Sequence, residues 1–202
     1  MRYPMQNITS MAALLMTVLS LSACMSSIKP DTKPLDFYDF GLQDADNRIS
    51  FTLPLEKLDA TDAIQHSNIR YRLHYKHPSQ VFAYAESRWS TLPVDLLRQK
   101  VANAQPLNTT CGLKIQIVTF DQVFDDASSS QGVVQLQAEL TDRRSRKLLA
   151  STLISARHAA QSADARGGVA ALNIASTEAL QQAADWARET SQAAPACQTA
   201  TP

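Results

Sequence analysis

Apolar and polar side chains alternate in several stretches of the chain, the pattern of strands with one buried and one solvent-facing side. The clearest alternation covers residues 69–76, and a second apolar stretch covers 80–86 after a turn at 77–79. These two segments therefore predict a β-hairpin. Further strands are expected over residues 35–42, 49–55, 113–120, 134–141 and 148–156.

Two segments have helical spacing instead. In residues 91–103, Val94, Leu97 and Val101 share one face, Thr91 is a candidate N-cap and Pro93 falls in the first turn. An alanine-rich segment over about residues 169–188 also repeats its small and apolar positions with helical period. Strands followed by a helix, more strands and a closing helix predict one α/β domain with a mixed sheet.

The connecting segments are polar. We expect a loop over residues 59–68 with a short helical turn at 63–64, an exposed loop over 121–132 and a glycine-ended loop over 162–168. The basic segment 143–147 lies between two alternating segments, which favours a solvated hairpin turn over a binding patch.

The N-terminus has the features of an export signal. Arg2 precedes an apolar run over residues 11–19, which is too short to span a membrane. Leu21-Ser22-Ala23-Cys24 then fits the cleavage site of a bacterial lipoprotein, after which Cys24 carries the acyl chains. The alternative is an ordinary secretory signal in which the cysteine is incidental.

The expected organisation is a signal peptide over 1–23, a tether over 24–34, a domain over 35–190 and a tail over 191–202. Met25 stands where an aspartate retains lipoproteins at the inner membrane of enteric Gram-negative bacteria. This favours attachment to the outer membrane of a Gram-negative bacterium, on its periplasmic face.

Composition excludes one class of partner. The chain has 19 basic and 19 acidic residues, a formal net charge of +0, so nothing supports electrostatic capture of nucleic acid. With 45% hydrophobic and 19% charged residues, the chain has the balance of a globular protein.

Lipidation of Cys24 would leave Cys111 and Cys197 as the remaining cysteines. Outside the cytoplasm, two such cysteines in a small domain more often pair than stay free. We therefore expect a disulfide between the start of a strand and the C-terminal tail, the alternative being two free thiols.

Two short motifs and their order resemble one family. YRLHY at residues 71–75 and YAESRW at 84–89 precede the first helix, and an alanine-rich helix closes the domain. From about Phe37 to Ala187 the chain resembles the ABC-type transport auxiliary lipoproteins, which are similar to paraquat-inducible protein C. The resemblance implies a three-layer α/β/α sandwich with a mixed, mostly five-stranded sheet.

The same resemblance implies a non-enzymatic accessory of lipid transport, working beside an MCE-domain protein and an ABC or related permease. It carries no catalytic residues over to this chain. A homo-oligomer stays open, and a stand-alone periplasmic carrier of lipid or another small molecule is the alternative function.

Tyr84, Arg88 and Trp89 form the candidate partner-binding group, because aromatic and arginine side chains are enriched in binding hot spots. The alternative is that Trp89 packs under the first helix with Arg88 covering it.

Other site chemistry has little support. The sequence contains no phosphate-binding loop, dinucleotide fingerprint or nucleophile elbow, so we expect no cofactor and no enzyme. His74 and His77 straddle a turn without further zinc ligands, and Asp121, Asp125 and Asp126 lack calcium-loop spacing. We expect no metal site.

Overall fold

The computed structural model describes residues 33–42, 47–102 and 110–197. The signal peptide, Cys24 and most of the tether lie outside the described residues. The chain divides into two units, Met1–Pro34 and Leu35–Pro202, and the elements below all belong to the second. Among the described residues, no helix combines the length and the apolar composition needed to cross a membrane.

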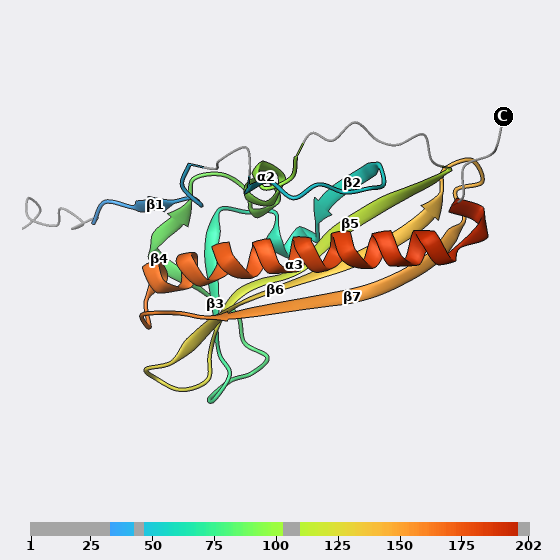
Figure 1. Cartoon of the computed structure of the whole chain (residues 1–202). Coiled ribbons are helices and arrows are strands. Elements are labelled where there is room, and N and C mark those ends of the chain that lie inside the picture. Colours follow the sequence, from blue (N-terminus) through green and yellow to red (C-terminus); the bar gives the residue numbers. More distant parts are fainter. Residues whose placement is uncertain (1–32, 43–46, 103–109, 198–202) are drawn as a thin grey trace, which may run out of the picture. The chain divides into compact units, whose positions relative to one another are not determined.

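Seven strands form one mixed sheet (Figure 1). The strands are β1 (Asp36–Tyr38), β2 (Leu55–Ala60), β3 (Asn68–Leu73), β4 (Phe82–Trp89), β5 (Cys111–Phe124), β6 (Ser130–Asp142) and β7 (Leu148–Ala159). Their order is β1-β4-β3-β5-β6-β7, and β2 also pairs with β5. β5, β6 and β7 form an antiparallel meander, whereas β2 and β3 pair in parallel with two successive parts of β5.

The α/β class, the mixed sheet and the predicted hairpin of β3 and β4 are confirmed. The strand number and one loop were wrong. The described residues form seven strands rather than mostly five, and the expected loop over 121–132 is largely strand. Its polar residues were a misleading signal for a loop. Asp121, Gln122 and Ser130 lie in β5 and β6 and are buried, with hydrogen-bond or ion-pair partners.

The expected strand over 49–55 is an extended segment with only one bridge to the described chain, from Ile49 to Val101. Its alternation is nevertheless real, since Ile49, Phe51 and Leu53 are all buried in the core. Ladder pairing begins after Pro54, which lacks an N–H but accepts a hydrogen bond from Leu113 N through its carbonyl. β2 continues to Ala60, so the first two residues of the loop expected over 59–68 belong to a strand.

Two α-helices are described, α2 (Pro93–Gln99) and α3 (Ala165–Ala193), with 3₁₀ turns η3 (Asp62–Ile64) and η4 (Pro195–Cys197). The turn at 63–64 is confirmed as part of η3. Pro93 begins α2 as predicted, but the N-cap is Leu92 rather than Thr91. The hydroxyl of Thr91 lies near the Asp95 carboxylate and caps no backbone N–H.

α3 begins four residues before its predicted start at 169, because Asp164 caps it. Oδ1 of Asp164 accepts a hydrogen bond from Gly167 N at 2.8 Å. Gly168 follows at a close approach, since a Cβ there would lie 2.0 Å from Oε1 of Gln122 on β5. Gly168 thus lets the first turn of α3 pack against the sheet, whereas a Cβ at Gly167 would meet the backbone of Ser162 in the preceding loop.

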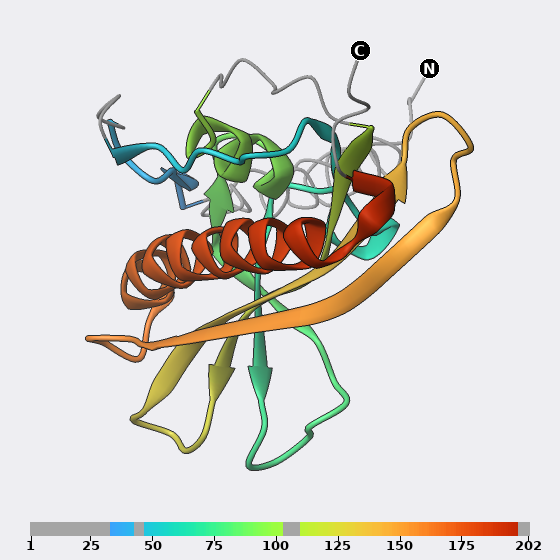
Figure 2. The same cartoon turned by 45° about the vertical axis from the view of Figure 1, so that its right-hand side comes forward.

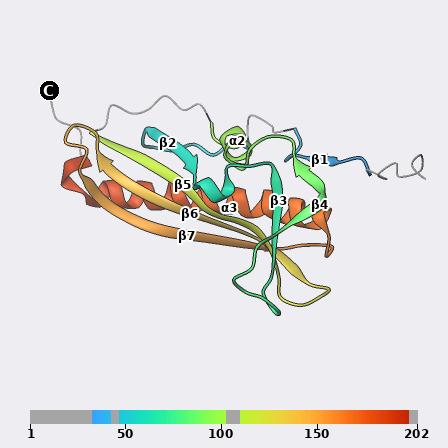
Figure 3. The same cartoon turned by 180° about the vertical axis from the view of Figure 1, so that it is seen from behind.

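The core lies between the sheet and one helical layer. α3 crosses β5, β6 and β7 (Figure 2), and α2 adds Leu96 and Leu97 to the same cluster of buried side chains. Figure 3 shows the sheet from behind. On β5 and β6, Lys114, Gln116 and Gln137 alternate with the core residues and are only partly buried. A second helical layer is not seen over β5–β7 among the described residues, so the α/β/α sandwich remains unconfirmed.

A covalent bond joins the C-terminal end of the domain to the start of β5. Cys111 at the start of β5 and Cys197 in η4 form a disulfide, with their Cα atoms 5.0 Å apart. The predicted pairing is thereby confirmed in this structure. The tail expected from residue 191 is still helical to Ala193 and then turns through η4, which places Cys197 at the edge of the core.

The basic segment between β6 and β7 is an exposed turn, as predicted. Oδ1 of Asp142 accepts hydrogen bonds from Arg144 N at 2.8 Å and Ser145 N at 3.0 Å. These bonds lower the pKa of the Asp142 carboxyl below its usual range, that of Ser145 N contributing most. The basic side chains project from a closed turn rather than lining a cleft.

Candidate functional site

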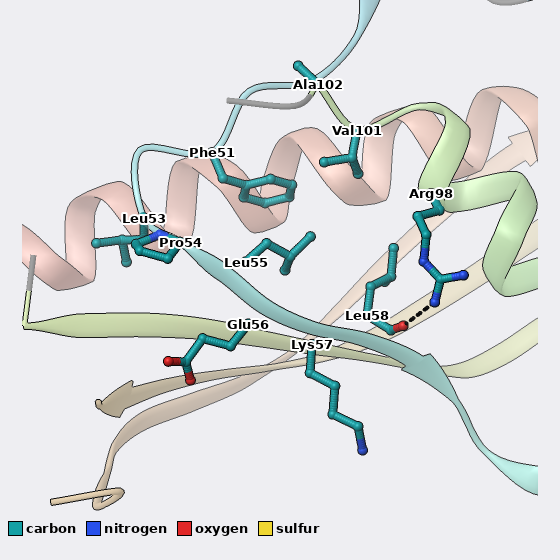
Figure 4. A pocket seen from close by; sticks show the side chains of 10 residues that line it. All are labelled: Phe51, Leu53, Pro54, Leu55, Glu56, Lys57, Leu58, Arg98, Val101 and Ala102. Atoms are coloured by element: carbon teal, nitrogen blue, oxygen red, sulfur yellow. Dashed lines mark hydrogen bonds between the residues drawn. The ribbon is translucent and has the colours of Figure 1, made fainter. Parts of the chain in front are cut away.

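A groove of about 550 Å³ lies beside β2 (Figure 4). It falls within the size range of small-molecule sites, which are mostly apolar with a few polar groups. Apolar side chains make most of its wall, and Figure 4 shows Glu56 and Lys57 pointing away from Phe51, Leu55 and Val101. The lining residues are Phe51, Leu53, Pro54, Leu55, Glu56, Lys57, Leu58, Arg98, Val101 and Ala102.

Local features of β2 shape this groove. The register between β2 and β5 shifts between Leu55 and Lys57, so Glu56 is an extra residue at a bulge. Glu56 lies over Gly112, where a Cβ would come within 2.4 Å of its carboxyl carbon, and pairs with Arg143 at 3.1 Å. The bulge thus turns the acidic side chain across β5 and leaves leucines along the groove.

Arg98 joins α2 to the outer edge of β2. Its Nη2 donates to the carbonyl of Leu58 at 3.0 Å, and its Nη1 pairs with Asp95 (Figure 4 shows the bond to Leu58). A carbonyl on a strand edge would otherwise be open to another strand. Arg98 therefore closes one position of this edge and also places a positive charge at the groove.

The predicted group Tyr84, Arg88 and Trp89 is not a common surface. Trp89 is 1% exposed and packs against Phe40 and Phe120, with ring centroids 5.8 and 5.5 Å apart. A partner protein cannot reach Trp89. The structure therefore agrees with the alternative, in which Trp89 is a core residue. Arg88 donates to the backbone carbonyl of Ser87 at 2.8 Å.

Tyr84 belongs to a half-buried polar network. Its hydroxyl donates to Oε1 of Gln122 at 2.8 Å, and Gln122 in turn donates to the Ser130 hydroxyl at 2.8 Å. Burial raises the pKa of Tyr84 well above its usual range, and Tyr71 and Asp164 add to the shift. The phenol stays neutral and serves as a donor that supports the buried amide of Gln122.

Asp121 is the most buried charged residue in the described part of the chain, and its pairing was not predicted from the sequence. Asp121 is 0% exposed and pairs with Nε of Arg70 at 2.8 Å and Nε of Arg72 at 2.6 Å. It lies in β5 and not in the exposed loop expected over 121–132. The available signal was the alternation of two arginines in one strand, which indicates that both side chains share a face.

The acidic residues weighed as calcium ligands have other partners in the structure. Among the described residues, no three His, Cys, Asp or Glu side chains are grouped as metal ligands. Asp121 is held by arginines, whereas Asp126 accepts hydrogen bonds from the backbone and hydroxyl groups of Ser128 and Ser129. These bonds lower the pKa of the Asp126 carboxyl, that of the Ser129 hydroxyl contributing most.

Comparison with known proteins identifies the fold alone. A Xanthomonas campestris protein of the family DUF330 superposes with a TM-score of 0.59 and 19% identity, covering 79% of this chain and 95% of its own. An uncharacterised protein of known structure superposes with a TM-score of 0.54 and 15% identity, covering 78% and 99% of the two chains.

A candidate lipoprotein from Caulobacter crescentus aligns over 50% of this chain and 85% of its own with 16% identity, but its TM-score of 0.35 is too low to support an argument. No family model matches the sequence, and no curated protein is significantly similar to it.

Proposed function

We propose that this chain is a non-enzymatic lipoprotein, anchored through Cys24 to the periplasmic face of the outer membrane. There it would serve as an accessory component of an MCE- and ABC-type lipid transport system between the two membranes. The lipid-transport part of this proposal is supported by the sequence resemblance to transport auxiliary lipoproteins. The fold shared with the DUF330 protein is compatible with it.

The observation that carries the proposal is the pairing of the cysteines. The chain has three, and Cys111 and Cys197 are bonded to each other, which leaves Cys24 as the one available for acylation. Disulfides persist in oxidising compartments such as the periplasm. An exported domain with its remaining cysteine inside Leu21-Ser22-Ala23-Cys24 supports a lipid-anchored protein.

A docking role suits such a domain. Confinement to a membrane surface raises the effective concentration of the domain near partners on the same surface. The partners expected from the resemblance are an MCE-domain protein and its permease.

Crosslinking in intact cells, followed by purification on a C-terminal tag, tests this function. We expect an MCE-domain protein or its permease to copurify with the wild-type chain and to be lost with Cys24→Ser, which cannot be acylated. Recovery of outer-membrane assembly proteins alone would contradict the transport role. Membrane fractionation of both variants reports the anchor independently.

A second candidate, a stand-alone lipid carrier, is favoured by the groove beside β2. Its lining combines a mostly apolar wall with the charged residues Glu56, Lys57 and Arg98, as an amphipathic ligand would require. A carrier of this kind would retain lipid after purification without any partner protein.

Ala102→Trp tests the carrier because it fills the groove, and Ala127→Trp adds the same bulk at the exposed tip of the β5–β6 hairpin. Mass spectrometry of the purified proteins should find lipid in the wild type and in Ala127→Trp but not in Ala102→Trp. Equal lipid content in all three would rule out this groove as the carrier site.

A further inference from the structure

A second hollow, of about 310 Å³, lies on the sheet face opposite α3. Arginines from two strands border it, β3 on one side and β7 on the other. Its lining residues are Arg72, His74, Thr119, Val123, Asp125, Val133, Gln135 and Arg157.

The strand register places these side chains on one face. Val133 pairs with both Asp121 and Arg157, and Val123 pairs with Arg72. Directly paired residues in neighbouring strands point to the same side of a sheet. The two valines therefore form an apolar floor, and the two arginines stand on opposite sides of it.

Positive charge exceeds negative charge at this hollow. Arg70 and Arg72 on β3 share the single negative charge of Asp121. The bond of Arg72 to this carboxylate uses Nε only. Among the described residues, no partner is bonded to Nη1 or Nη2 of Arg72 or to the guanidinium of Arg157. The one carboxylate in the lining, Asp125, accepts a hydrogen bond from Gln131 at 2.8 Å.

We propose that this hollow binds a phosphate oxyanion, in a phospholipid headgroup or as free phosphate. The planar fork of a guanidinium matches the geometry of phosphate oxygens, and both arginines have unoccupied N–H groups. His74 can add a further donor from the rim. The valine floor offers apolar contact to the carbon atoms of a glycerol ester, which favours a headgroup. Only that last assignment rests on the proposed transport function.

Calorimetric titration of the purified full chain in nonionic detergent tests the site. The two probes are inorganic phosphate and glycerophosphoglycerol, a soluble phosphodiester headgroup. Arg157→Gln removes one charge without breaking an ion pair, and Arg72→Lys keeps the charge beside Asp121 but loses the fork. We expect each change to weaken binding about tenfold, the effect of losing one charge-assisted hydrogen bond.

Lys114→Gln is the matched control, because Lys114 lies on the same face of β5 on the order of 15 Å from Thr119. Tighter binding of the phosphodiester assigns the site to headgroups, whereas tighter binding of phosphate overturns that assignment but upholds the oxyanion site. Absence of binding by both probes, or equal loss in Lys114→Gln, overturns the site. The crosslinking test for transport partners is independent of all these outcomes.

Discussion

Arg72 Nε lies 2.6 Å from Oδ2 of the buried Asp121, joining β3 to β5 across 49 residues of sequence. Arg70, two residues earlier on the same strand, approaches the other carboxylate oxygen at 2.8 Å. The contact fixes which part of β5 lies beside β3. It also explains how Asp121 can be buried within β5, although the sequence pattern predicts that this strand ends at residue 120.

Asp121→Asn should destabilise the domain by about 3 kcal/mol, because removing one partner of a buried ion pair leaves the other charges uncompensated. The partial exposure of Arg70 and Arg72 keeps the loss at the low end of the range for such pairs. Urea unfolding followed by circular dichroism measures the change. Asp125→Asn, in the exposed hairpin, is the control and should leave the free energy of unfolding within about 0.5 kcal/mol of the wild type.

Cys197→Ser should lower the free energy of unfolding by about 2–4 kcal/mol, because the bond to Cys111 closes a loop with a sequence separation of 86 residues. Urea unfolding with and without reductant measures the loss. Reductant should destabilise the wild type and leave Cys197→Ser unchanged. A wild-type protein whose midpoint does not respond to full reduction would contradict a stabilising bond.

Gly132→Ala should destabilise the domain by about 1–3 kcal/mol through overpacking. A Cβ at Gly132 would lie 2.5 Å from the backbone nitrogen of Leu172 in α3, and backbone atoms there cannot move aside without shifting the helix. Thermal unfolding measures the effect. Gly41→Ala is an informative comparison because nothing lies within 4 Å of its Cβ position, so any loss there reflects the positive φ of 71°.

Asp164→Ala should lower stability by about 1 kcal/mol at neutral pH, because it removes the N-cap of α3. The hydrogen bond from Gly167 N is the largest cause of the lowered pKa of Asp164, followed by the Ser162 hydroxyl. A lowered folded-state pKa means that the stabilisation is complete above the unfolded pKa, roughly 3.9, and is lost as pH falls below it. Unfolding measured from pH 7 to pH 3 should show wild type and Asp164→Ala converging, whereas a constant difference would contradict this assignment.

The β3–β4 hairpin and the first turn of α2 could be predicted because their signals are local. Alternation from Ile69 shows which side of β3 is buried, and Pro93 can occupy a first helical turn wherever the helix packs. The cysteine pairing could also be predicted, since the expected lipidation of Cys24 leaves Cys111 and Cys197 as a single pair. The groove beside β2 could not, because it depends on how the segment around Phe51 lies against Val101.

By itself, the sequence determined the α/β class, the mixed sheet and the pairing of Cys111 with Cys197. The export signal with its acylatable cysteine is a prediction from the same sequence. Only the tertiary structure decided where β5 ends and how closely α3 approaches it. Asp121 is compatible with a buried strand only because Arg70 and Arg72 meet it from β3, and Gly168 permits the close approach because Gln122 fills the space where its Cβ would lie. Partners distant in the chain decided both features, and a local pattern contains no information about them.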